Sequence, residues 1–361
     1  MFEIKAIDQA AQTAAVERQN QLTKPPGSLG QLEEIAIRLA GHQGAVCPKV
    51  TTPWISVFAA DHGVADEGVS AFPSVVTQEM VKNFSAGGAA ITVLAKANQA
   101  SFEVVDVGVL ADITEEGVHS FENLQSFRVA AGSFNFAKQP AMTSEMLNKA
   151  MAAGCLAVER ASESGADLFI GGEMGIGNTT SATAMIAQVC EVSVEEIVGI
   201  GTGIDQTQKQ HKAQVIKAAL EKHRAEMKDP LDVLACVGGL EIAALAGAYL
   251  ACAEKGLTMV VDGVIACAAA LVVCEVAPEV KEWMIFGHQS VEPAQQAVFK
   301  RLQVRPLLDL SLRLGEGSGA AMAIPVIKMA CVLHEQMATF TEAGVSESEV
   351  CDSEPEVMNA H

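Results

Sequence analysis

The chain has 361 residues, half of them hydrophobic and 19% charged, so it can bury a large core and is not disordered over most of its length. Its formal net charge of −20 argues against nucleic acid as a partner, because an acidic surface repels phosphate backbones. Nine cysteines without a C-x-x-C pair, and an N-terminus without a signal-peptide pattern, together predict a cytoplasmic protein.

The first 45 residues are predicted to be helical, apart from a loop at residues 24–30 that contains two prolines and two glycines. From Trp54 onward, short apolar runs alternate with alanine-rich helical stretches. The runs are WISVFAADHG, FEVVDVG, DLFIGGEMG, EIVGIGTG, TMVVDG and WMIFGHQS, and the helices include residues 86–97, 179–189, 239–254 and 263–274. This alternation predicts a doubly wound, mostly parallel, Rossmann-like sheet with helices on both faces.

The same patterns divide the chain into three parts. Residues 46–316 are predicted to form an α/β domain, residues 1–45 plus 317–345 a small helical domain built from both chain ends, and the acidic residues 346–361 a disordered tail. An apolar run at residues 260–277 contains Asp262 and Glu275, so we expect a strand end followed by a buried helix rather than a membrane span.

A glycine-rich segment, GGEMGIGNTTSATA at residues 171–184, follows one predicted strand and opens a helix. This arrangement is typical of phosphate binding, because glycines let the backbone approach the anion and the helix N-terminus favours negative charge. The segment matches neither G-x-G-x-x-G nor a Walker A loop, which favours a small phosphate ester over a dinucleotide or triphosphate. A glycine-rich turn without a ligand stays the alternative.

A second glycine cluster, GIGTGID at residues 199–205, is followed by Lys212 one or two helical turns later. A lysine at that spacing could reach a phosphate held between the two glycine clusters. Spacing alone equally allows a solvated surface lysine.

Glu316 lies between two glycines in RLGEGSGAA, residues 313–321. A partly desolvated glutamate has a raised pKa and suits proton abstraction, so the pattern favours a general base. The alternative is a glutamate that complements the dipole at the start of a helix.

Two further segments carry polar side chains without a specific signature. DHGVADEG at residues 61–68 offers Asp61 and His62, but acidic turns are common and a structural loop is favoured over a metal site. FGHQS at residues 286–290 offers His288 and Ser290, and no nucleophile elbow surrounds this serine. Neither a metal nor a hydrolase triad is therefore expected.

The order and spacing of these motifs resemble the nicotinate-nucleotide–dimethylbenzimidazole phosphoribosyltransferase family. The resemblance runs from KPPGSLGQLE near residue 24 through ADHGVADEG, VVDVG, GGEMGIGNTT, GIGTG, DVLACVGG, VVDG, GHQS and RLGEGSGAA to about residue 330. It implies transfer of the 5-phosphoribosyl group of nicotinate mononucleotide to dimethylbenzimidazole, in assembly of the cobalamin lower ligand, by a homodimer that needs no cofactor. It also makes 46–316 the nucleotide- and base-binding domain, and lets the helical domain of one subunit cover the site of the other.

The resemblance also implies roles for individual residues. Glu316 matches the base that removes the benzimidazole proton, and Glu173 matches a second carboxylate that steadies the ribose or its developing charge. The phosphate and ribose positions are Gly175, Ile176, Gly177, Asn178, Gly201 and Lys212, and the base pocket is Phe72, Met80, Ser290 and Leu314. Phe72 and Met80 replace more polar residues of better-known members, which leaves the accepted base open.

Two other functions are weighed against this one. A nucleotide-dependent oxidoreductase is disfavoured because no G-x-G-x-x-G with a later ribose-binding acid is present. A non-catalytic protein that binds a phosphate ester or a benzimidazole would have no use for a base such as Glu316.

Overall fold

The computed structural model describes residues 3–111, 113, 123–201 and 203–346. The chain forms two compact units: Met1–Ile7 with Lys49–Lys328, and Asp8–Pro48 with Met329–His361. The first residues belong to the larger unit because the Lys5 N–H donates to the Ala253 carbonyl at 3.1 Å and Trp283 Nε1 donates to the Lys5 carbonyl at 3.0 Å. Apart from Ser346, the predicted acidic tail lies outside the described residues.

The larger unit is built on a six-stranded parallel sheet with the order β3-β2-β1-β4-β5-β6. Its strands are β1 Pro53–Ala60, β2 Ser101–Gly108, β3 Leu124–Ser126, β4 Leu168–Met174, β5 Thr258–Val261 and β6 Met284–Phe286. The strand order reverses between β1 and β4, and this is where an open α/β sheet binds its ligands. The loops that follow β1 and β4 therefore frame the expected binding crevice.

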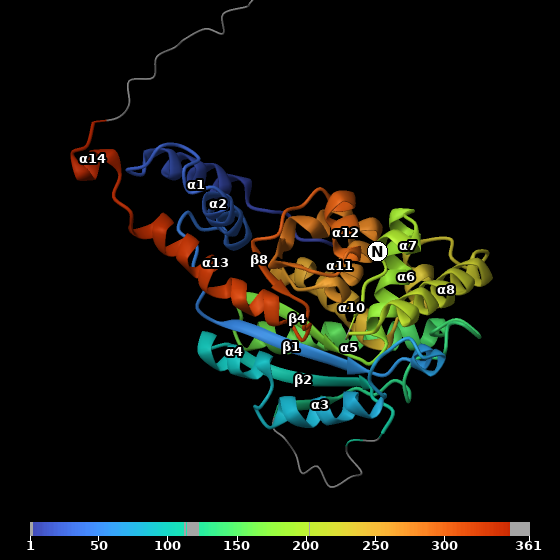
Figure 1. Cartoon of the computed structure of the whole chain (residues 1–361). Helices are drawn as coiled ribbons and strands as arrows, with labels where there is room; N and C mark the ends of the chain where they lie inside the picture. Colours follow the sequence, from blue (N-terminus) through green and yellow to red (C-terminus); the bar gives the residue numbers. More distant parts are fainter. Residues whose placement is uncertain (1–2, 112, 114–122, 202, 347–361) are drawn as a thin grey trace, which may run out of the picture. The chain divides into compact units, whose positions relative to one another are not determined.

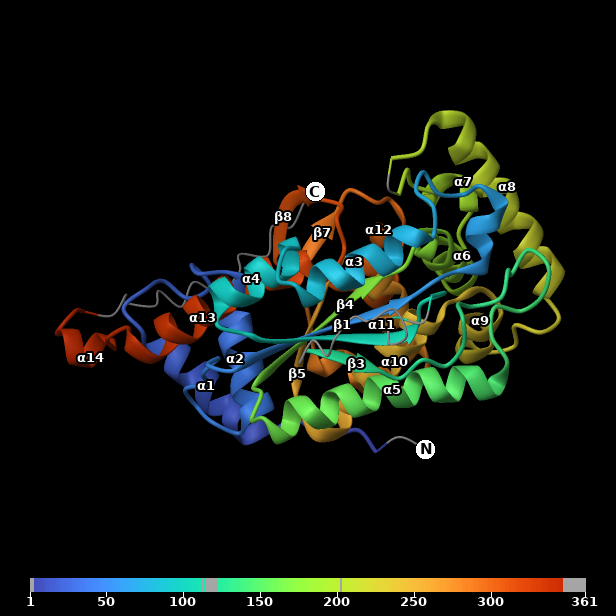
Figure 2. The same cartoon turned by 90° about the horizontal axis from the view of Figure 1, so that it is seen from below.

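Helices cover both faces of this sheet, which confirms the predicted fold class. Helices α3 (Val75–Ser85) and α4 (Ala90–Asn98) contact one face, and α5 (Ser144–Glu163) and α10 (Leu240–Lys255) contact the other (Figures 1 and 2). The run at 260–277 becomes the end of β5 followed by the buried helix α11 (Val264–Val276), as predicted. Within the described ranges, no helix has the length and apolar character needed to cross a membrane.

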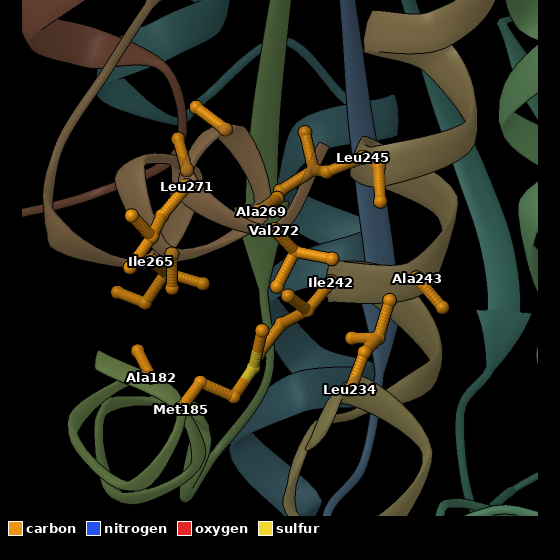
Figure 3. Packing of buried hydrophobic residues seen from close by; sticks show 14 of the residues in the cluster. Ala182, Met185, Leu234, Ile242, Ala243, Leu245, Ile265, Ala269, Leu271 and Val272 are labelled. Atoms are coloured by element: carbon orange, nitrogen blue, oxygen red, sulfur yellow. The ribbon is translucent and has the colours of Figure 1, made fainter. Parts of the chain in front are cut away.

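The core of the larger unit lies among α5, α10, α11 and α6 (Asn178–Cys190), and its buried cluster includes Ile242, Leu245 and Leu271 (Figure 3). Small residues let the two longest helices there approach closely. A Cβ added at Gly154 of α5 would lie 1.9 Å from the Ala244 carbonyl oxygen of α10. The high alanine and glycine content thus reflects close packing of helix backbones.

Two predicted strands differ from the structure. In EIVGIGTG, Glu196 and Ile197 end the short helix α7 (Val194–Ile197), and Gly201 and Gly203 adopt φ of 52° and 117°, which a strand does not allow. WMIFGHQS divides at Gly287 into β6 and β7 (His288–Ser290), and β7 pairs with β8 (Leu308–Leu312) in a separate two-stranded parallel sheet. The remaining elements of this unit are α8 Gln206–His223, α9 Pro230–Val237, α12 Ala294–Leu302 and the 3-10 helices η1 Gly63–Glu67 and η2 Pro278–Trp283.

The smaller unit is helical. It contains α1 (Gln9–Gln21), α2 (Gln31–Gln43), α14 (Phe340–Ala343) and the last residues of α13 (Ser318–Gln336), which starts in the larger unit. Arg18 of α1 donates to the carbonyls of His334 and Glu335 at 2.8 and 2.7 Å, and so joins the two ends of the chain.

Candidate active site

The first glycine loop, residues 174–177, connects β4 to α6 at the point where the strand order reverses. Its backbone lies directly against the end of β1. A Cβ at Gly175 would be 2.4 Å from the Ala60 carbonyl oxygen, and Gly177 has a φ of 99°. Both glycines are therefore required by the path of the backbone. The loop and the N-terminus of α6 face the crevice, as expected for an anion site.

Glu173 lies at the end of β4 and is buried, with an exposed fraction of 5%. Its carboxylate accepts a hydrogen bond from Asn178 Nδ2 and another from the backbone N–H of Glu316. Burial, followed by repulsion from Glu241 and Asp262, raises the pKa of Glu173 well above that of an ordinary glutamate. The side chain is thus held in place by one donor at the start of α6 and one on the loop before α13.

The RLGEG loop, residues 313–317, packs on the end of β4. Gly315, Glu316 and Gly317 have φ of 84°, 64° and 87°, so the backbone is in the left-handed region at three consecutive residues. A Cβ at Gly172 would lie only 2.1 Å from the Glu316 carbonyl oxygen, and a Cβ at Gly315 would lie 2.4 Å from Glu173 Oε1. Glycines on both elements therefore bring Glu316 and Glu173 to the same end of the sheet.

Asp262 holds the end of this loop in place through hydrogen bonds to backbone N–H groups. It follows β5, and its two carboxylate oxygens accept from the Gly317 N–H at 3.1 Å and the Ala320 N–H at 2.8 Å. His288 Nε2 lies 3.4 Å from Asp262 Oδ1, and the pair is buried. Asp262 thus caps the start of α13 and holds the backbone that carries Glu316.

The Glu316 side chain points to a different helix from the one it precedes. Its Oε2 accepts from the backbone N–H of Ile91, in the first turn of α4, at 3.4 Å. Burial raises the pKa of Glu316, the Ile91 N–H opposes this, and Asp262 adds to it. A carboxylate in these surroundings can accept a proton from a bound substrate more readily than an exposed one.

Lys212 of α8 is a buried residue and not the surface lysine that spacing also allowed. Its Nζ donates to Thr179 Oγ1 of α6 at 2.8 Å and so joins α8 to the helix of the first glycine loop. Burial lowers the pKa of Lys212 to about 8, against attraction from Glu292. The second glycine loop, residues 199–201 and 203, lies beside it, and Gly201 donates its N–H to Glu292 Oε1 at 3.0 Å.

One pocket gathers many of the predicted residues. Those that line it are Glu173, Gly175, Ile176, Asn178, Gly201, Ser290 and Leu314. Those that do not line it are Gly177, Lys212, Glu316, Phe72 and Met80. Phe72 is 50% exposed and Met80 is half-buried on α3.

Several residues that line this pocket were not predicted from the sequence, namely Thr179, Gly263, Val264, Ile265, Glu292 and Arg313. Arg313 was visible as part of the RLGEG motif. Glu292 carries no local signal, because only the path of the chain after β7 brings it to the second glycine loop.

His62 packs against the first glycine loop, since a Cβ added at Gly175 would lie 3.1 Å from His62 Cδ2. Both ring nitrogens of His62 are engaged, Nε2 with Glu241 Oε1 at 2.6 Å and Nδ1 with Ser181 Oγ at 2.9 Å. In the ranges that the structure describes, no three His, Cys, Asp or Glu side chains are arranged to hold a metal ion. Within the DHGVADEG segment, His62 thus joins the starts of α6 and α10.

Comparison with known proteins agrees with this architecture. A family model described as Phosphoribosyltransferase matches residues 4–345. A Pseudomonas putida (strain W619) protein named nicotinate-nucleotide–dimethylbenzimidazole phosphoribosyltransferase is 52% identical over 344 residues, which cover 95% of this chain and 97% of that protein. A protein of the same name from Pseudomonas aeruginosa (strain LESB58) is 50% identical over 343 residues, with 95% and 96% covered.

Solved structures give the same result. The crystal structure of CobT from Thermus thermophilus superposes with a TM-score of 0.89 at 44% identity, over 94% of this chain and 99% of that one. The resemblance drawn from the motifs is confirmed, and with it the prediction of an enzyme that transfers a phosphoribosyl group. The chain belongs to the phosphoribosyltransferase family that contains these nicotinate-nucleotide–dimethylbenzimidazole enzymes.

Proposed function

We propose that the chain transfers the 5-phosphoribosyl group of nicotinate mononucleotide to 5,6-dimethylbenzimidazole or a related base, and so forms α-ribazole 5′-phosphate for the cobalamin lower ligand. The observation that carries the proposal is Glu316, a buried carboxylate held beside a phosphate-type glycine loop at the switch point of the sheet. The names of the relatives support the choice of substrates.

In the proposed reaction, one imidazole nitrogen attacks C1′ of the ribose while Glu316 removes the proton from the other nitrogen. The bond between C1′ and the pyridinium nitrogen breaks, and its electron pair neutralises that nitrogen, so nicotinate leaves without a general acid. The proton ends on Glu316, whose raised pKa suits it to this task. Charge and atoms balance without a metal or a redox cofactor.

Glu173 is proposed to face the positive charge that develops on the ribose, and its fixed position makes it a preorganised group for that purpose. The proposed phosphate and ribose contacts are Gly175, Ile176, Gly177, Asn178, Gly201 and Lys212. The proposed wall of the base pocket is Phe72, Met80, Ser290 and Leu314. Of this wall, Leu314 is 57% exposed and offers an apolar surface at the pocket.

We also propose that the enzyme works as a homodimer in the cytoplasm. Exposed apolar side chains close to the site, Leu314, Leu310 and Val291, support a covering second subunit. Each of the eight cysteines in the described ranges is a free thiol, which suits a reducing compartment.

The test is a product assay with the purified full chain, nicotinate mononucleotide, and a panel of azoles and phenols, read by mass spectrometry. Release of nicotinate together with an α-ribosyl phosphate of one of these bases is the expected result. Binding of both substrates without turnover would instead identify a non-catalytic binding protein and overturn the proposal.

A further inference from the structure

Glu292 occupies an unusual position for a carboxylate. It follows β7, is buried with an exposed fraction of 6%, and lines the pocket. Its Oε1 accepts from the Gly201 N–H at 3.0 Å. A Cβ added at Gly199 would lie 1.7 Å from Glu292 Oε2, so this carboxylate rests directly on the backbone of the second glycine loop.

A buried cation, Lys212, lies at the same glycine loop. Glu292 is the group that attracts the Lys212 ammonium, and a Cβ added at Gly201 would lie 3.5 Å from Lys212 Nζ. Nζ also donates to Thr179 Oγ1 at 2.8 Å. The Gly201 N–H thus binds the Glu292 carboxylate directly, and the Lys212 ammonium lies at the same loop and is attracted to that carboxylate.

Gly201 and Lys212 are also residues to which the proposed function assigns the phosphate of the mononucleotide. Gly201 cannot donate its N–H to a phosphate while Glu292 accepts that hydrogen bond. A phosphate dianion that approaches Gly201 and Lys212 also meets the negative charge of Glu292, and like charges at close range repel in a partly buried site.

We infer that Glu292 is an internal competitor for the phosphate subsite, and that the phosphate of the mononucleotide displaces its carboxylate from the Gly201 N–H. The inference rests on the proposed function. The site would then select the mononucleotide over free phosphate. Free phosphate contacts only the phosphate subsite, so it gains no other interactions to offset the cost of displacing Glu292. A mononucleotide gains further contacts through its ribose and its base, so it can displace Glu292 where small anions fail.

The experiment measures dissociation constants of inorganic phosphate and of nicotinate mononucleotide by titration calorimetry. The proteins are the wild type, Glu292→Gln and Glu292→Ala. The matched control is Glu195→Gln, which removes one negative charge from the exposed surface of the same unit. We expect both Glu292 variants to bind inorganic phosphate at least about tenfold more tightly than the wild type, and the control to be unchanged. The affinity for the mononucleotide should also rise.

Phosphate affinity that is unchanged or weaker in both folded Glu292 variants would overturn the inference. Weaker mononucleotide binding with unchanged phosphate binding would also overturn it, because Glu292 would then be a ligand of the ribose. The proposed function is tested separately by the product assay on the wild type. A wild type without product would refute the function, whereas tighter phosphate binding by the variants would still establish a competed anion site.

Discussion

Replacing Glu316 with Gln is expected to abolish most of the turnover and to leave the fold intact. Glutamine has nearly the same size, adopts the same φ of 64° as readily, and keeps the backbone N–H that binds Glu173. It cannot accept the benzimidazole proton. Loss of a general base lowers kcat by roughly 10²–10⁴, which corresponds to about 3–5 kcal/mol of transition-state stabilisation.

The effect on stability should be much smaller than the effect on rate. The Glu316 carboxylate accepts one long hydrogen bond, 3.4 Å from the Ile91 N–H, which is worth at most about 1 kcal/mol. Its pKa is raised in the folded chain, chiefly by burial, so its ionised form opposes folding as the pH rises through that pKa. At neutral pH the variant should therefore unfold at an equal or slightly higher urea concentration, and the two proteins should converge in acid.

The measurements are the initial rate of α-ribazole phosphate formation at saturating substrates, and urea unfolding at neutral and acid pH. Glu195→Gln provides the control for the loss of one negative charge on the surface. A Glu316→Gln protein with turnover within about threefold of the wild type would refute the assignment of the base. Loss of activity together with several kcal/mol of stability would refute the geometric reasoning, because Glu316 would then be a structural residue.

Three further predictions test the surroundings of this base. Lys212→Ala should raise KM for the mononucleotide more than KM for the base. In the wild type, KM for the mononucleotide should rise above pH about 8, where the buried Lys212 ammonium loses its proton. An effect of the substitution on KM for the base alone would place the phosphate elsewhere. Gly172→Ala should lower turnover and should lower the free energy of unfolding by about 1–3 kcal/mol, because the new methyl group would lie 2.1 Å from the Glu316 carbonyl oxygen. Unchanged urea unfolding of this variant would contradict the prediction. Chelator should leave the rate unchanged, and recovery of a lost rate by an added divalent ion would contradict this.

The sequence is sufficient to predict the first glycine loop and its sheet because both signals are local. A strand, a glycine loop and the start of a helix follow one another directly between Leu168 and Asn178, so their order in the chain is also their order in space. The close approach at Gly175 is likewise set by a neighbouring strand end, Ala60, which the alternation of strands and helices already brings near.

Other features depend on the path of the chain and leave no local pattern. Residues 196–203 have the composition of a strand, yet the left-handed backbone at Gly201 and Gly203 prevents one. Glu292 is an ordinary glutamate in the sequence, and only the turn after β7 places it on the second glycine loop. Phe72 and Met80 were assigned to the base pocket from a family pattern; they do not line the pocket that contains Glu173, and their place in the base pocket stays a prediction.

In the proposed reaction, the charges around the site should favour release of nicotinate before release of α-ribazole phosphate. Asp262 raises the pKa of both Glu173 and Glu316, and Glu316 also raises the pKa of Glu173, so the crevice resists additional negative charge. In the proposed reaction the mononucleotide arrives with a positive pyridinium, which such a site attracts. When the glycosidic bond breaks, that positive charge disappears and the leaving molecule becomes an anion. The carboxylates that help to bind the substrate should therefore repel nicotinate, while the phosphate held near Lys212 keeps the other product in place.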